Sequence, residues 1–202
     1  MRVRCFHFGF LATLLVCLVA FESTASAQIF GRKKQMRKAS EMIRRQAPPK
    51  IDQSLEGIIS PENSRVVISI SKQRAYLYAG DQIYIDTPVS TGKRTGMTPT
   101  GSFTVLQKNA DHKSNIYGNF VNSKGRVVRS GISLKVDSAP SGTRYVGAPM
   151  KYFCRFTWSG VGMHVGILPG YPASHGCVRL PADIAPIMYR NVKLGTPVQI
   201  EP

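Results

Sequence analysis

Short apolar runs separated by turn-forming residues fill the chain from residue 64 onward, and this feature constrains the fold most. The runs are rich in β-branched and aromatic side chains, and glycine-containing breaks such as Gly80-Asp81 and Ser159-Gly160 separate them. Runs of this length and composition are typical of strands. The pattern predicts strands at 65–71, 75–79, 82–90, 102–107, 151–158 and 196–200.

A single helix is expected close to the end of the chain. Pro181 suits a first helical turn, and Gly195 separates the segment from the last predicted strand. The helix is therefore predicted over 181–191, short or bent because Pro186 removes one backbone N–H from its interior. Several strands with one short helix predict a mainly β domain, built as a sandwich or a partly closed barrel.

The first 27 residues have the organisation of a secretory signal peptide. Arg2 and Arg4 precede an apolar stretch over 8–21, and the small-residue sequence Ala-Ser-Ala follows at 25–27. The apolar stretch is shorter than the roughly 20 residues that span a bilayer, which favours cleavage over anchoring. We expect an exported protein located in the periplasm, with a thick cell wall as the alternative.

Residues 28–63 are predicted to form a basic linker that precedes one folded domain at 64–202. Segment 31–50 contains eight basic residues and one acidic residue, and the whole chain has a formal net charge of +16. In an exported protein this charge favours anionic envelope surfaces and wall-peptide carboxylates over nucleic acid. A charged tail without a specific role is the alternative for the linker.

The stretch 160–180, GVGMHVGILPGYPASHGCVRL, concentrates the candidate reactive side chains. If 161–167 is extended, its odd-numbered apolar residues share one face and His164 lies on the other. Gly162 and Gly166 flank His164 and leave room for a neighbour or a ligand. A surface or hydrogen-bonded histidine without a chemical role is the alternative.

Cys177 follows a loop rich in proline and glycine that allows the chain to return toward His164. An imidazole beside a thiol can increase the thiolate fraction by forming a thiolate–imidazolium pair. Gly176 permits a tight turn, so that backbone N–H groups near Cys177 could stabilise an oxyanion. The hypothesis is a nucleophilic Cys177 with His164 as its base, both in an accessible groove.

Two other readings of these residues have weaker support. Zinc could be held by His164, His175 and Cys177, but a fourth ligand and the usual ligand spacings are missing. Ser174 could be a nucleophile, but the glycine-flanked serine signature of α/β-hydrolases is absent.

Cys154 is the other cysteine beyond the predicted signal peptide. It alternates with Phe156 and Trp158 in a predicted strand, which favours a small apolar residue in the core. A disulfide with Cys177 and a regulatory thiol are the alternatives.

The motifs resemble the active-site signature of the L,D-transpeptidase catalytic domain, or YkuD-type, family. In that signature an upstream histidine, here His164, precedes a loop and then Ser/Thr-His-Gly-Cys, here 174–177. The sequences STGK at 90–93 and TPTGSF at 98–103 are similar to two further family elements. The resemblance covers about residues 65–201.

This resemblance implies an L,D-transpeptidase-type β-sandwich with one short helix after the catalytic cysteine. It implies that Cys177 attacks the carbonyl between the third residue of a peptidoglycan tetrapeptide stem, typically diaminopimelate, and the terminal D-alanine. A thioester forms, and an amine acceptor resolves it in cell-wall cross-linking. His164 is implied as the proton acceptor and donor, with a backbone carbonyl orienting its ring. No cofactor or metal is implied.

Four neighbouring residues are expected to shape the pocket or bind substrate. Arg179 is predicted to hold a stem carboxylate, with a surface salt bridge as its alternative. The whole set is Ser174, His175, Gly176 and Arg179.

Other functions remain open at this point. Transfer to water would make the chain an L,D-carboxypeptidase or a hydrolase of links between wall and protein. A non-enzymatic wall-binding protein is the alternative from another class. Nine residues separate His164 from Ser174, a shorter loop than in many family members, which leaves the acceptor undecided. The oligomeric state is not predicted.

Overall fold

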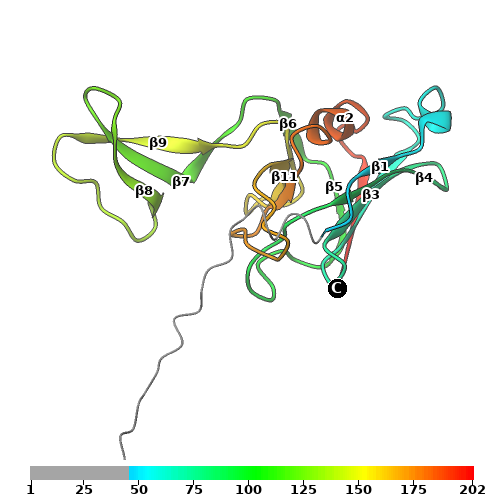
Figure 1. Cartoon of the computed structure of the whole chain (residues 1–202), viewed down its shortest axis with the longest axis horizontal. Coiled ribbons are helices and arrows are strands. Elements are labelled where there is room, and N and C mark those ends of the chain that lie inside the picture. The colour runs from blue at the N-terminus through cyan, green and yellow to red at the C-terminus, as the bar shows by residue number, and fades with distance from the viewer. Residues whose placement is uncertain (1–45) are drawn as a thin grey trace, which may run out of the picture. The chain divides into compact units, whose positions relative to one another are not determined.

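A computed structural model describes residues 46–202 of the chain (Figure 1). Within this range the chain forms sheets of six, four and three strands and one α-helix. The mainly β fold predicted from the sequence is therefore confirmed. The predicted signal peptide and the predicted linker up to residue 45 lie outside the described residues.

The largest sheet contains six strands in the order β1-β4-β3-β2-β13-β5. β13 and β2 run parallel, whereas the other neighbours in this sheet are antiparallel. In β3, buried residues alternate with half-exposed ones, as expected for a sheet with one face in the core. The strands are β1 (Lys50–Ile51), β2 (Ser64–Ser69), β3 (Arg74–Ala79), β4 (Gln82–Pro88), β5 (Gly101–Thr104) and β13 (Pro197–Glu201).

The four-stranded sheet has the order β12-β11-β10-β6. β11 pairs in parallel with β12 and antiparallel with β10. Cys154, Met163 and Val178 lie opposite one another on these three strands, and all three are buried in the core. One face of this sheet therefore packs against the core. The strands are β6 (Gln107–Asn109), β10 (Phe153–Arg155), β11 (Gly162–Val165) and β12 (Val178–Leu180).

Two predicted strands end earlier than expected. The strand predicted at 102–107 divides between sheets, because β5 ends at Thr104 and β6 begins at Gln107. β10 covers three residues of the strand predicted at 151–158, and the chain then turns. Trp158 is 81% exposed, so its expected place on the buried face with Cys154 is wrong. Alternation of faces applies only while the backbone stays extended.

The three-stranded sheet, in the order β8-β7-β9, was not predicted from the sequence. Almost all residues of β8 are exposed, so the segment lacks the apolar alternation that identifies a strand. The sheet instead depends on close backbone packing. A Cβ on Gly147 would lie 2.1 Å from the carbonyl oxygen of Ser114, and only glycine fits there. The strands are β7 (Lys113–Asn122), β8 (Val127–Ser133) and β9 (Thr143–Pro149).

The α-helix α2 spans Ala185–Arg190 and is shorter than the helix predicted at 181–191. Pro186 lies in its first turn, where a missing backbone N–H breaks no helical hydrogen bond. The proline was expected inside the helix and instead marks its beginning. Within residues 46–202, no helix is long and apolar enough to cross a membrane.

Part of the predicted linker packs onto the domain. β1 pairs with β4 and forms the edge of the six-stranded sheet, and Asp52 caps the 3-10 helix η1 (Gln53–Leu55) by accepting a hydrogen bond from the Ser54 backbone N–H. Leu55 is only 4% exposed. Burial of this side chain and the strand pairing fix the segment to the sheet, so the folded part begins before the predicted boundary at residue 64.

Candidate active site

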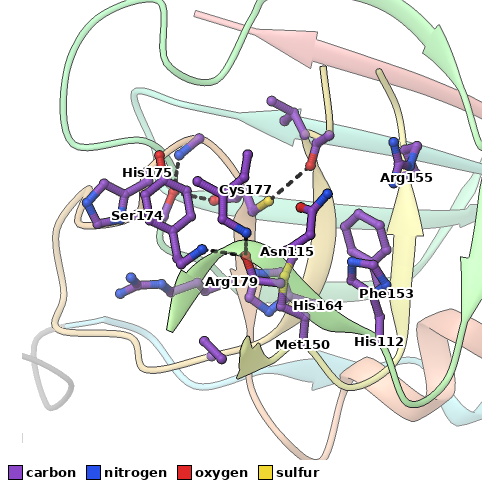
Figure 2. Close-up of a pocket in the computed structure, with 18 of the residues that line it drawn as sticks. His112, Asn115, Met150, Phe153, Arg155, His164, Ser174, His175, Cys177 and Arg179 are labelled. Atoms are coloured by element: carbon purple, nitrogen blue, oxygen red, sulfur yellow. Dashed lines mark hydrogen bonds between the residues drawn. The ribbon is translucent and has the colours of Figure 1, made fainter. Parts of the chain in front are cut away.

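The strand register places the predicted nucleophile and base on neighbouring strands. His164 of β11 lies opposite Arg179 of β12, and Cys177 directly precedes β12. Cys177 and Arg179 are two residues apart, so their side chains share the face of His164. This is the face opposite the core-facing Cys154. Figure 2 shows His164, Cys177 and Arg179 around one pocket.

A cavity of about 1010 Å³ is lined by both His164 and Cys177. Its walls come from β7, the end of β9, β10, β11 and the loop before β12. The structure brings all the sequence-predicted site residues into this cavity: His164, Ser174, His175, Gly176, Cys177 and Arg179. The part of the wall formed by β7 and β9 was not predicted from the sequence, because neither strand was predicted.

His164 is oriented by a backbone carbonyl. Its Nδ1 lies 2.7 Å from the carbonyl oxygen of Val165, which can only accept a hydrogen bond, so Nδ1 carries the proton. The lone pair of Nε2 is then available as a base. Burial lowers the pKa of His164 to about 4, with the positive charge of Arg179 contributing in the same direction. The imidazole is therefore neutral at pH 7.

The thiol of Cys177 is also neutral in this structure. Its Sγ lies 3.6 Å from the carbonyl oxygen of Gly160, to which it donates. Burial raises its pKa, and the Gly162 backbone N–H and the positive charge of Arg179 oppose this shift. Among the described residues no hydrogen bond joins Cys177 to His164. The expected thiolate–imidazolium pair is thus not present, because burial disfavours both charged forms.

The turn before Cys177 is held by hydrogen bonds that involve the Ser-His-Gly-Cys, TPTGSF and STGK elements. The Ser174 hydroxyl donates to the carbonyl of Cys177 and accepts from the Gly176 N–H. The Thr98 hydroxyl donates to the carbonyl of Gly176 at 2.6 Å and accepts from the Gly92 N–H at 2.8 Å. Ser174 is therefore a positioning residue, buried within the turn.

Gly176 is required by the backbone at this turn. Its φ is +139°, and a Cβ would lie 2.9 Å from the carbonyl oxygen of Met97. The tight turn expected from the sequence is present. The N–H of Gly176 is bonded to the Ser174 hydroxyl, however, so it is not free to bind an oxyanion.

His175 connects the loop before β12 to the three-stranded sheet. Its ring stacks on Tyr117 of β7 with 4.4 Å between ring centroids, and its Nε2 lies 3.3 Å from Nζ of Lys93. Burial lowers the pKa of His175, and the charges of Lys93 and Arg179 add to this effect. Lys93 belongs to the STGK element at 90–93, so this motif could have identified it as a site residue. Nothing in the sequence pointed to Tyr117.

Protein atoms fill the space beside His164 that its flanking glycines leave. A Cβ on Gly162 would lie 2.2 Å from the carbonyl oxygen of Cys154, and one on Gly166 would lie 2.6 Å from Cγ of Arg179. The glycines thus allow close packing of β10 and of the Arg179 side chain. β11 ends at Val165, and Ile167 is 69% exposed, so the expected apolar face does not continue to it.

Arg179 forms no ion pair with any described carboxylate. Its Nη1 donates to the carbonyl of Ile167 at 3.4 Å, and burial lowers the pKa of its guanidinium. The alternative of a surface salt bridge therefore does not describe this residue within residues 46–202.

Cys154 packs in the core, as predicted, with no exposed surface. Burial raises the pKa of its thiol to about 12, which keeps it protonated and unreactive. Cys154 and Cys177 are both free thiols, so the alternative of a disulfide between them is wrong. In the described part of the chain, no group of three histidine, cysteine, aspartate or glutamate residues could hold a metal ion.

Comparison with known families decides the relationship of the chain. The family model of the L,D-transpeptidase catalytic domain, YkuD, matches residues 63–200. The chain belongs to this family. Its members are cysteine enzymes that act on the stem peptides of peptidoglycan. No curated protein sequence matches the chain.

Solved structures of L,D-transpeptidases share the fold. One from Mycobacterium smegmatis has a TM-score of 0.52 at 23% identity, with 69% of this chain and 59% of that chain covered. The L,D-transpeptidase LdtMt1 in complex with imipenem has a TM-score of 0.51 at 24% identity, with 68% and 58% covered. One from Stackebrandtia nassauensis has a TM-score of 0.50 at 17% identity, with 81% and 64% covered.

These alignments confirm the predicted L,D-transpeptidase-type β fold. The chain spans about three fifths of the length of the first two structures. The family predicted from the His164 and Cys177 motifs is likewise confirmed by the family model.

Proposed function

We propose that the chain is a peptidoglycan L,D-transpeptidase with Cys177 as nucleophile and His164 as proton acceptor and donor. The observation that carries this proposal is the placement of His164 on β11 and of Cys177 at the start of the adjacent parallel strand β12, with both side chains in one cavity. The Val165 carbonyl fixes the tautomer that leaves Nε2 unprotonated, which is the form a general base needs.

The proposed reaction has two acyl-transfer steps. In the first, Nε2 of His164 takes the thiol proton while Sγ of Cys177 attacks the carbonyl before the terminal D-alanine. The tetrahedral intermediate collapses to a thioester, and the departing amine takes the proton from His164. In the second, an acceptor amine attacks the thioester, gives a proton to Nε2, and forms the new amide while Cys177 recovers its proton.

The charge of the cavity suits a peptide with several carboxylates. Four cationic side chains line it, and none of its lining residues is an aspartate or glutamate. The cationic residues are Lys135, Lys151, Arg155 and Arg179. We propose that Arg179 binds a stem carboxylate and that His175, held by Tyr117 and Lys93, forms part of the substrate-binding wall.

The products of a purified tetrapeptide fragment test the transfer reaction. We expect a cross-linked dimer with loss of one D-alanine, because the acceptor amine of a second stem competes with water in a largely apolar site. Mass spectrometry of the reaction mixture identifies the product. Release of D-alanine with tripeptide as the sole other product would assign the chain as an L,D-carboxypeptidase instead.

Export is the second part of the proposal, and it rests on the organisation of residues 1–27. The mature chain would act in the periplasm, with its basic segment attracted to anionic envelope surfaces. We expect cleavage after Ala27, so N-terminal sequencing of the protein recovered from the periplasm should begin at Gln28. An uncleaved chain that sediments with membranes would contradict this expectation.

A further inference from the structure

A second arginine lines the same cavity from β10, the other neighbour of β11. Arg155 of β10 lies opposite Gly162 of β11, and Gly162 shares the face of His164 two residues further on. The face that carries His164 therefore carries Arg179 on one neighbouring strand and Arg155 on the other. Figure 2 shows the same arrangement, with Arg179 to the left of Cys177 and Arg155 to the right.

Arg155 has unused hydrogen-bonding capacity at this position. Its Nε is buried and has no hydrogen-bond partner among the described residues, the one such side-chain nitrogen or oxygen found there. Buried polar groups in folded proteins are almost always paired, so an unpaired one calls for an explanation. Arg155 also makes no ion pair with a described carboxylate. Lys151, another cation in the cavity wall, is paired with Asp111.

The guanidinium of Arg155 lies within electrostatic reach of the nucleophile. Its charge favours the thiolate of Cys177, as does that of Arg179. Strands two positions apart in a sheet are separated by about 10 Å, which is the separation expected between β10 and β12. Arg179 follows Cys177 on the β12 side, and Arg155 lies across β11 from both. A planar guanidinium with free N–H groups matches a carboxylate in geometry and charge.

We propose that Arg155 is a second carboxylate-binding residue, which holds a carboxylate of the donor peptide on the β10 side of the cavity, whereas Arg179 holds one on the β12 side. The inference rests on the proposed function, because the donor has carboxylates on both sides of the bond that Cys177 attacks. The C-terminal carboxylate of D-alanine lies beyond that bond, and the side-chain carboxylate of diaminopimelate lies before it. Each arginine binds one of the two.

Amidated substrates test this assignment. The probes are the free-acid tetrapeptide, its C-terminal amide, and the peptide amidated at the diaminopimelate side chain. With the free acid, Arg155→Gln should lower kcat/KM about tenfold or more, mainly through KM, and Arg155→Lys should restore part of it. One of the two amides lacks the carboxylate that Arg155 binds, and on that amide Arg155→Gln should lower kcat/KM no further. On the other amide, which lacks the carboxylate that Arg179 binds, Arg179→Gln should lower kcat/KM no further.

Controls separate binding from folding. Arg65 lies outside the cavity, where its guanidinium stacks on Tyr78, so Arg65→Gln should change none of these constants. Thermal unfolding reports whether each variant keeps its fold. If Arg155→Gln lowered kcat/KM equally on the free acid and on both amides, or did not lower it at all, the assignment of Arg155 would be overturned. A wild-type protein that releases no D-alanine would instead overturn the proposed function.

Discussion

Cys177→Ser should reduce turnover of a tetrapeptide by about four orders of magnitude or more, without loss of the fold. The substitution replaces one atom, and a hydroxyl can keep the hydrogen bond that Sγ donates to the Gly160 carbonyl. The serine hydroxyl is far less acidic than a thiol, and burial disfavours its alkoxide still further. The release of D-alanine measures the loss.

The same substitution should abolish covalent labelling by a carbapenem. The strained amide carbonyl of a carbapenem such as imipenem is an electrophile that the proposed nucleophile Cys177 should attack to form a thioester. Intact-mass spectrometry should find one adduct on the wild type and none on Cys177→Ser. Cys154→Ala is the matched control, since Cys154 has no exposed surface and its loss should leave the adduct unchanged. An adduct that persists on Cys177→Ser would exclude this cysteine as the nucleophile.

His164→Gln should lower kcat/KM for the tetrapeptide about 10²- to 10⁴-fold, the usual contribution of a general base. The pKa of His164 is lowered to about 4, so the base is neutral and active at every pH above that value. The rate should therefore fall only as the pH drops through about 4, and not near 6.5 as for an exposed histidine. A pH profile of kcat/KM for the wild type measures this fall in rate.

Iodoacetamide labelling of Cys177 distinguishes a neutral pair from an ion pair. Labelling requires the thiolate, and the pKa of Cys177 is raised by burial. In wild type the labelling rate should rise about tenfold per pH unit from pH 6 to 8. Similar labelling of His164→Gln would confirm that the imidazole does not ionise the resting thiol. A rate that is constant between pH 5 and 8 would show a preformed thiolate–imidazolium pair and contradict the neutral assignment.

Local patterns predicted a large part of this fold because β2, β3 and β13 of the main sheet each have their own apolar alternation. The buried Ala75, Leu77 and Ala79 of β3 are an example. β7, β8 and β9 have little such alternation, because they bury only a few apolar side chains, such as Phe120 and Ile132, while most of β8 is exposed and β7 meets β9 through glycines. A sequence pattern that depends on burial could not reveal them.

The candidate site likewise contains residues that the sequence could identify and residues that it could not. His164 and the Ser-His-Gly-Cys element could be found because motif residues lie close together in the chain. Tyr117 and Arg155 come from other strands, and only the pairing of β10 with β11 and the stacking of His175 on Tyr117 bring them to the cavity. The register between distant segments is a long-range property that local spacing does not contain.

The sequence by itself determined the family and the main strands and indicated the proposed reactive pair, because these depend on short-range composition and spacing. The tertiary structure alone decided the ionisation of that pair and the walls around it. Both His164 and Cys177 are neutral because the assembled strands and loops remove water from them, and desolvation arises only when distant segments pack together.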